Sequence, residues 1–407
     1  MASGSSLPAE DTDDGASQPA PQFGMEEQMA GLSEGERAAN LKNYQFSFQQ
    51  NLDEGTGKSV FIEADSIPVV RDNLTVAYEL LGSDWESVTS SVVNYRVENG
   101  RTYHAYKDGS YLYPNDTDEQ DRQQFEHVIL QHLMGGRLYF APFSQEHPPR
   151  RILDIGTGTG IWAIELGFEY PTAKVLGTDL SAIQPTDVPP NVEFYVEDTR
   201  DEWHWYRQED RFDYIHTRMT LGCWEDLKVD VVQKSFDQLE PGGWFEAQDL
   251  LSSILCDDDT MADDNPLKLH FEDIEDATAS EGRPLNSGDK WRKACEEVGF
   301  VDITEYVFKV PINGWPRELR WKELGKMWEA NCLHGIQAVT YGPLGRIRHL
   351  SRNQMEMLLL DVRKAISDTS VHAYQKFFIV LGRKPYPDEV GQPAGVTTEE
   401  DTAMVDC

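Results

Sequence analysis

Basic residues are scarce in this sequence. It contains 36 Lys and Arg against 71 Asp and Glu, which gives a formal net charge of −35. Such a negative protein repels polyanions, and proteins bind the nucleic-acid backbone mainly through Lys and Arg. The densest basic stretch, residues 346–352, has a helical spacing that is typical of a solvated helix face. We therefore expect no direct binding to nucleic acid.

Cysteines are also few, and long apolar runs are missing. The cysteines are odd in number and far apart, and form no Cys-x-x-Cys pair or Cys/His cluster at metal-ligand spacing. They are Cys223, Cys256, Cys295, Cys332 and Cys407. No apolar run reaches the roughly 18 residues of a membrane span, and no charged segment before an apolar stretch opens the chain. We expect no metal, no membrane association and no secretion, and a cytoplasmic location with the nucleus as the alternative.

The two ends of the chain differ in composition from its middle. Residues 1–45 and 387–407 are rich in small and acidic residues and poor in β-branched and aromatic ones. Such segments cannot bury enough apolar surface to offset the entropy of ordering. We predict disorder for both.

The middle of the chain divides near residue 150. Residues 46–149 form a predicted helical extension, with one helix near residues 72–81 and another that begins in the polar run 115–122 and continues through Leu133. Residues 150–386 form the predicted main domain, with helical insertions.

From Arg151 onward, short apolar runs alternate with helical patterns. Alternation of this kind is typical of a parallel sheet with helices on both faces. The predicted strands are residues 151–155, 175–179, 192–196, 212–217, 244–248, 303–310 and 377–381, and the later helices are residues 267–281, 289–298, 318–339 and 351–366. The pattern predicts an α/β, Rossmann-like fold with a mostly parallel sheet of seven strands.

The first predicted strand runs into the motif D-x-G-x-G-x-G. Gly156, Gly158 and Gly160 have no Cβ, so a ligand can lie against the turn and the start of the next helix. A dinucleotide site has G-x-G-x-x-G, and a carboxylate beside it would repel the pyrophosphate. Asp154 instead suits a cation, and S-adenosylmethionine carries a sulfonium and an α-amino group. The motif favours S-adenosylmethionine, and leaves an NAD-dependent oxidoreductase as the weaker alternative.

Polar side chains also follow the next three predicted strands. Asp179 lies 19 residues after Gly160, where a carboxylate can accept both hydroxyls of a ribose, or else cap the following turn. Asp198 can accept the amine of adenine, or be a solvated loop acid. His216 and Arg218 lie where open α/β sheets bind ligands, and can contact cofactor or acceptor, or cap a helix.

The sequence thus yields a set of cofactor residues but no catalytic one. The predicted cofactor-binding residues are Asp154, Gly156, Thr157, Gly158, Gly160, Asp179, Leu180, Asp198 and Thr199. A general base is needed only if the acceptor must lose a proton before attack. His104, His216 and Glu246 are conceivable bases, but sequence spacing identifies a partner for none of them.

With these residues in view, the chain resembles the fungal LaeA-like methyltransferases, a branch of the class I S-adenosylmethionine-dependent superfamily. The resemblance covers roughly residues 95–385, and one departure is Gly-Thr-Gly at residues 156–158, where Gly-Cys-Gly is common. Besides the glycine motif, it rests on residues 98–106, Tyr111, residues 114–116, 119–122, 160–164 and 179–185, and a Pro-Gly-Gly turn at residues 241–243 before the fifth strand.

The resemblance implies a class I methyltransferase fold whose upstream helices form a lid over the cofactor. Tyr103, Tyr106 and Tyr111 would then pack around the donor or acceptor pocket, or else be core aromatics of the helical layer. The implied activity is methyl transfer to an O, N or S of a small molecule in fungal secondary metabolism. The alternative is a methyltransferase-like regulatory subunit of a nuclear complex that controls secondary-metabolite genes, which requires a protein partner.

Overall fold

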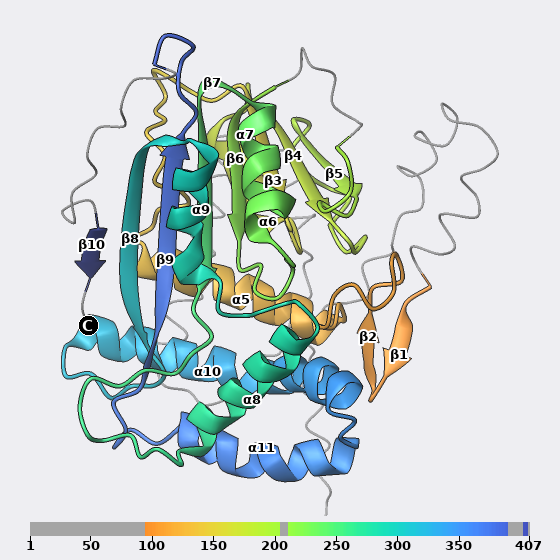
Figure 1. Cartoon of the computed structure of the whole chain (residues 1–407), viewed down its shortest axis with the longest axis vertical. Helices are drawn as coiled ribbons and strands as arrows, with labels where there is room; N and C mark the ends of the chain where they lie inside the picture. Colours follow the sequence, from red (N-terminus) through yellow and green to blue (C-terminus); the bar gives the residue numbers. More distant parts are fainter. Residues whose placement is uncertain (1–93, 204–210, 390–401, 406–407) are drawn as a thin grey trace, which may run out of the picture. The chain divides into compact units, whose positions relative to one another are not determined.

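A single mixed sheet organises the part of the chain that the computed structural model describes, residues 94–203, 211–389 and 402–405 (Figure 1). The predicted helix near residues 72–81 and the N-terminal segment 1–45 lie outside these ranges. No helix in the described ranges has the length and apolar character that a bilayer span requires.

The sheet has the strand order β10-β8-β9-β7-β6-β3-β4-β5. Strand β9 is antiparallel to both of its neighbours, and the other neighbouring strands are parallel. The bounds are β3 Arg151–Ile155, β4 Lys174–Asp179, β5 Val192–Val196, β6 Phe212–Arg218, β7 Leu239–Leu250, β8 Val301–Pro311, β9 Tyr374–Arg383 and β10 Thr402–Val405. The predicted Rossmann-like sheet of seven mostly parallel strands is confirmed as β3 to β9.

Strand β10 is an addition to the predicted sheet. It pairs in parallel with β8 at the edge, inside the segment 387–407 for which the sequence predicts disorder. An edge strand presents unpaired backbone groups, and a short extended segment can pair with them without contributing to the core. The expectation of disorder therefore does not hold for residues 402–405, and residues 390–401 and 406–407 lie outside the described ranges.

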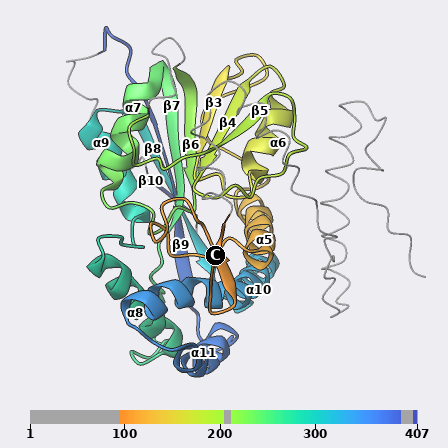
Figure 2. The same ribbon diagram turned by 90° about the vertical axis from the view of Figure 1, so that its right-hand side faces the viewer.

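Helices cover both faces of the sheet, as predicted. Figure 2 shows α7 and α9 on one side and α6 on the other. Buried Trp291 of α9 packs on one face with residues of β3, β6 and β7, and buried Trp162 of α6 packs on the other face with residues of β3, β4 and β5. The bounds are α6 Ile161–Glu169, η1 Lys228–Val232, α7 Gln233–Gln238, η2 Gly288–Lys290 and α9 Trp291–Val298.

A second helical layer lies at the carboxyl ends of the parallel strands (Figure 1). Its helices share one apolar core, in which Leu130 of α5, Trp328 of α10 and Met355 of α11 are buried. The layer consists of α5 Thr117–Leu133, α8 Pro266–Ser280, α10 Leu319–Gly342, η3 Pro343–Ile347 and α11 Arg352–Ile366. Cofactor and acceptor sites of open α/β sheets lie at this end of the strands.

The described part of the predicted helical extension contains one helix, α5. Before it, β1 Arg96–Glu98 and β2 Arg101–Tyr103 form an antiparallel hairpin. Asn99 and Gly100 form its turn with φ of 55° and 85°, the positive values that a tight hairpin turn requires. Residues 104–116 then run without regular structure to α5, and we call them the cover segment.

Helix α10 contacts the cover segment through a glycine. A Cβ at Gly342 would overlap the backbone carbonyl oxygen of Leu112, whereas a Cβ at Gly345 would meet its nearest neighbour, Met355 Cε, at an ordinary 3.5 Å. We expect Gly342→Ala to lower the free energy of unfolding by about 1–3 kcal/mol, because backbone must move. Gly345→Ala should change it by less than about 0.5 kcal/mol. Equal denaturation midpoints for the two variants would contradict this close packing.

Candidate cofactor and active site

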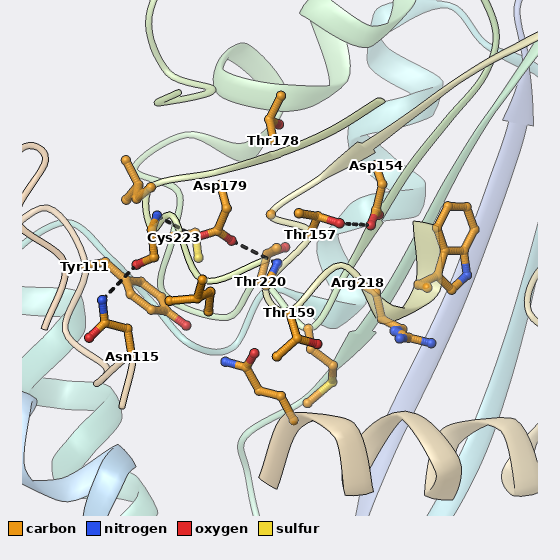
Figure 3. A pocket seen from close by; sticks show the side chains of 18 of the residues that line it. Tyr111, Asn115, Asp154, Thr157, Thr159, Thr178, Asp179, Arg218, Thr220 and Cys223 are labelled. Atoms are coloured by element: carbon orange, nitrogen blue, oxygen red, sulfur yellow. Dashed lines mark hydrogen bonds between the residues drawn. The ribbon is translucent and has the colours of Figure 1, made fainter. Parts of the chain in front are cut away.

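A pocket opens at the carboxyl ends of β3 to β6, under α5 and the cover segment (Figure 3). Its volume is about 1210 Å³, including the solvent at its mouth. Most of the residues predicted from the sequence line it, namely Tyr111, Asp154, Gly156, Thr157, Gly158, Asp179, Leu180, Asp198, Thr199, His216 and Arg218. The fold therefore brings strand ends that are far apart in the sequence into one cavity.

The glycine turn has the backbone shape that the motif predicts. Gly156, Gly158 and Gly160 have φ of 67°, 57° and 79°, in the left-handed region that favours glycine. A Cβ at Gly158 would come within 2.8 Å of Gln123 Oε1, so the turn lies directly against α5. Gly160 does not line the pocket. Its missing Cβ leaves room for the ring of Phe194 on β5, which makes it a packing residue at the start of α6.

Asp154 is buried and has two hydrogen-bond partners. Its Oδ2 accepts a bond of 2.6 Å from the Thr157 hydroxyl, and its Oδ1 lies 2.8 Å from His216 Nδ1. The His216 ring stacks on Trp162 with a centroid separation of 3.7 Å, and its buried Nε2 has no hydrogen-bond partner. His216 thus has a partner, Asp154, that sequence spacing does not reveal. Through Thr157, Asp154 also fixes the glycine turn.

Asp179 lies on the opposite side of the turn. Its Oδ2 accepts from the backbone N–H of Gly158 and its Oδ1 from that of Ser181, each at 2.9 Å. Burial raises the pKa of Asp179 to about 6, and the two backbone bonds oppose this rise. The carboxylate is therefore fixed in the place where the sequence predicts a ribose ligand.

Asp198 has more partners than a solvated loop acid would have. Arg200 donates to it at 2.9 Å and 2.7 Å, and Lys107 of the cover segment lies 3.1 Å from its Oδ2. Burial alone would raise the pKa of Asp198, but the bonds from Arg200 and Lys107 outweigh burial and hold that pKa well below its usual value. An adenine amine that binds Oδ2 would have to compete with Lys107.

The three predicted tyrosines have different surroundings. Tyr111 lines the pocket, edge-on to Tyr113 with ring centroids 5.1 Å apart. Tyr103 is fully buried outside the pocket, under the guanidinium of Arg346 at 4.3 Å. Tyr106 also lies outside the pocket lining. The alternative role of a core aromatic therefore fits Tyr103, and only Tyr111 is placed to contact a ligand.

Two of the three conceivable bases, Glu246 and His104, lie outside the pocket lining. Glu246 accepts from the backbone N–H of Phe140 and Ala141 and from the Tyr214 hydroxyl, so it holds the connection between α5 and β3. His104 is buried near the Lys107 carbonyl, outside the pocket lining. Of the three, His216 alone lines the pocket.

Sequence reasoning missed the contribution of α5. Four of its residues line the pocket, namely Arg122, Gln123, Glu126 and His127. The apolar spacing of this helix indicates only the side that packs in the core. A signal was present, because polar residues that recur at intervals of three and four form a stripe just as apolar ones do. In the structure Glu126 and His127 are buried, and half-buried Arg122 lies between Glu119 and Glu126.

The pocket fits S-adenosylmethionine in its donor chemistry. The glycine turn leaves space that a Cβ would fill. Carboxylates lie at or just after the ends of three neighbouring strands, at Asp154, Asp179 and Asp198. These groups suit a cationic nucleoside with a ribose diol and an amine. When bound, the cofactor supplies an electrophilic methyl group on a sulfonium.

Comparison with known proteins points in the same direction. A family described as "Methyltransferase domain" matches residues 125–305. The secondary metabolism regulator LAE1 of Cochliobolus heterostrophus is 38% identical over 293 residues, which cover 71% of this chain and 94% of that protein. Methyltransferase pytC of Aspergillus terreus is 34% identical, over 75% of this chain and 92% of that protein. Protein-methionine methyltransferase laeA of Emericella nidulans is 33% identical, over 71% of this chain and 76% of that protein.

Fold, pocket and comparisons together define a class I methyltransferase that uses S-adenosylmethionine as its cofactor. Within this class, the chain belongs to the LaeA-like methyltransferase family. The class, the cofactor and the family that the sequence predicts are thereby confirmed, and the assignment of individual cofactor contacts stays a prediction.

The raised pKa of Asp179 predicts how cofactor affinity depends on pH. Ribose hydroxyls donate best to the charged carboxylate, so binding favours the deprotonated form, which predominates above a pKa of about 6. We expect the affinity for S-adenosylhomocysteine to fall by up to about tenfold from pH 7 to pH 5, measured by calorimetry. Asp179→Asn cannot titrate, and should bind more weakly with a flatter profile. An equal slope in both proteins would show that another group titrates.

Proposed function

We propose that the protein methylates an O, N or S atom of a small molecule in fungal secondary metabolism. The observation that carries this proposal is the apolar part of the pocket lining. Beyond the glycine turn it continues to Leu130 of α5 and to Met219 and Trp224 after β6. These side chains can accommodate the apolar part of a small acceptor beside the glycine turn. The name of pytC as a methyltransferase supports the same reading.

Methyl transfer is an in-line displacement, so the protein mainly has to align the acceptor with the methyl group and exclude water. The glycine turn and Asp179 orient the donor in this proposal. Helix α5 and the cover segment shield the pocket from solvent. If the acceptor must lose a proton, His216 is the candidate base, because its Nε2 has no partner and its Nδ1 is oriented by Asp154.

A second candidate is a regulatory methyltransferase that acts on a protein and works in the nucleus. The names of two relatives favour it, one as a regulator of secondary metabolism and the other as a protein-methionine methyltransferase. It requires a protein partner, whereas the small-molecule enzyme requires none and fits a cytoplasmic location.

Metabolite profiles of a deletion strain would separate the two candidates. We expect one compound lighter by a single CH₂ unit to accumulate, because its methylation step is lost. The gene for the unchanged protein should restore the product, whereas the gene for Asp179→Ala should not, provided that thermal denaturation shows that variant to be folded.

Broad silencing of unrelated pathways in the deletion strain would instead support the regulator. Full restoration by Asp179→Ala would contradict a role for bound cofactor. As a direct check, the purified protein should transfer a labelled methyl group from S-adenosylmethionine to the accumulated compound.

A further inference from the structure

Arg218, the last residue of β6, is the one arginine of the pocket lining with a buried nitrogen that has no hydrogen-bond partner. Its Nη2 lies 2.7 Å from His127 Nδ1, and its Nη1 is buried and unpartnered. The other arginines of the lining have carboxylate partners, since Arg122 bonds Glu119 and Glu126, and Arg200 bonds Asp198. Figure 3 shows Arg218 beside the glycine turn, directed toward α5.

The orientation of Arg218 is fixed by a chain of polar groups. His127 accepts from Arg218 through Nδ1, and its Nε2 lies 3.2 Å from Glu165 Oε2. Burial and the nearby positive charge of Arg218 lower the pKa of His127, so its ring is neutral and can accept this bond. A guanidinium held in place with a free N–H group is prepared for a ligand oxygen, because an unpaired buried donor is costly.

The charge of the pocket indicates what that ligand is. Asp154, Asp179 and Asp198 make the donor side acidic, which suits the cationic groups of S-adenosylmethionine but not its α-carboxylate. In the sheet, Thr217 is the register partner of Ile155, so Arg218 comes level with the start of the glycine turn. It is therefore the lining cation with a free N–H group beside the glycine turn.

We propose that Arg218 binds the α-carboxylate of S-adenosylmethionine and so selects for the intact amino-acid tail. His127 is a positioning residue for this contact. The inference rests on the cofactor and is independent of which acceptor the enzyme methylates.

Two ligands that differ only in this carboxylate test the proposal. We would measure binding of S-adenosylhomocysteine and of its decarboxylated analogue, S-adenosyl-3-thiopropylamine, to the full chain by calorimetry. The unchanged protein should prefer the carboxylate ligand by about 10- to 100-fold, the range for a charge-assisted hydrogen bond. Arg218→Met should bring this ratio close to one, and Arg218→Lys should retain part of it.

Arg348→Met is the control, because it removes a guanidinium that lies outside the pocket lining and pairs with Asp273 at the surface. The ratio of its affinities for S-adenosylhomocysteine and the decarboxylated analogue should equal that of the unchanged protein. If Arg218→Met does not fold, the ratios of the unchanged protein and of Arg218→Lys still decide the question.

Equal binding of both ligands by the unchanged protein would overturn the proposal. So would an undiminished ratio in Arg218→Met, and a raised KM for the acceptor in that variant would then place Arg218 at the acceptor instead. Failure of the unchanged protein to bind either ligand would contradict the cofactor itself, and is thus distinguishable from failure of the role of Arg218.

Discussion

One buried carboxylate connects the parts of the donor site. Asp154 lies one residue before the end of β3, and a buried carboxylate needs hydrogen-bond partners. Thr157 satisfies it from within the glycine turn, and His216 satisfies it from the neighbouring strand β6. The same two bonds therefore set the shape of the turn and the orientation of the imidazole, so the glycine turn and His216 share one fixed point.

Much of the sheet could be predicted from the sequence, because its strands are short apolar runs between clear turn signals. The bounds of β3 and β5 agree with the predicted ones. Strand β7 is longer than predicted, since it includes the Pro-Gly-Gly turn and begins at Leu239, the register partner of Phe212. Pairing with a neighbouring strand extended it, and local propensity does not contain that information.

The place of a residue in the pocket was predictable where it follows from a position at a strand end, as with Asp179. It was not predictable where the role depends on a tertiary partner. The bond between Arg218 and His127 spans 91 positions, and the Phe194 ring that requires Gly160 belongs to another strand. Apolar spacing does not reveal the polar stripe of α5, because it marks only the side of the helix that packs in the apolar core.

The ion pair between Lys107 and Asp198 ties the cover segment to the pocket wall. Lys107 belongs to the cover segment, whereas Asp198 belongs to the pocket lining. Lys107 also lies within bonding distance of Asp201, so it keeps a partner if Asp198 releases it. Lys107 can therefore release Asp198 without becoming an unpaired charge, and until then the two carboxylates together hold the cover segment on the loop that follows β5.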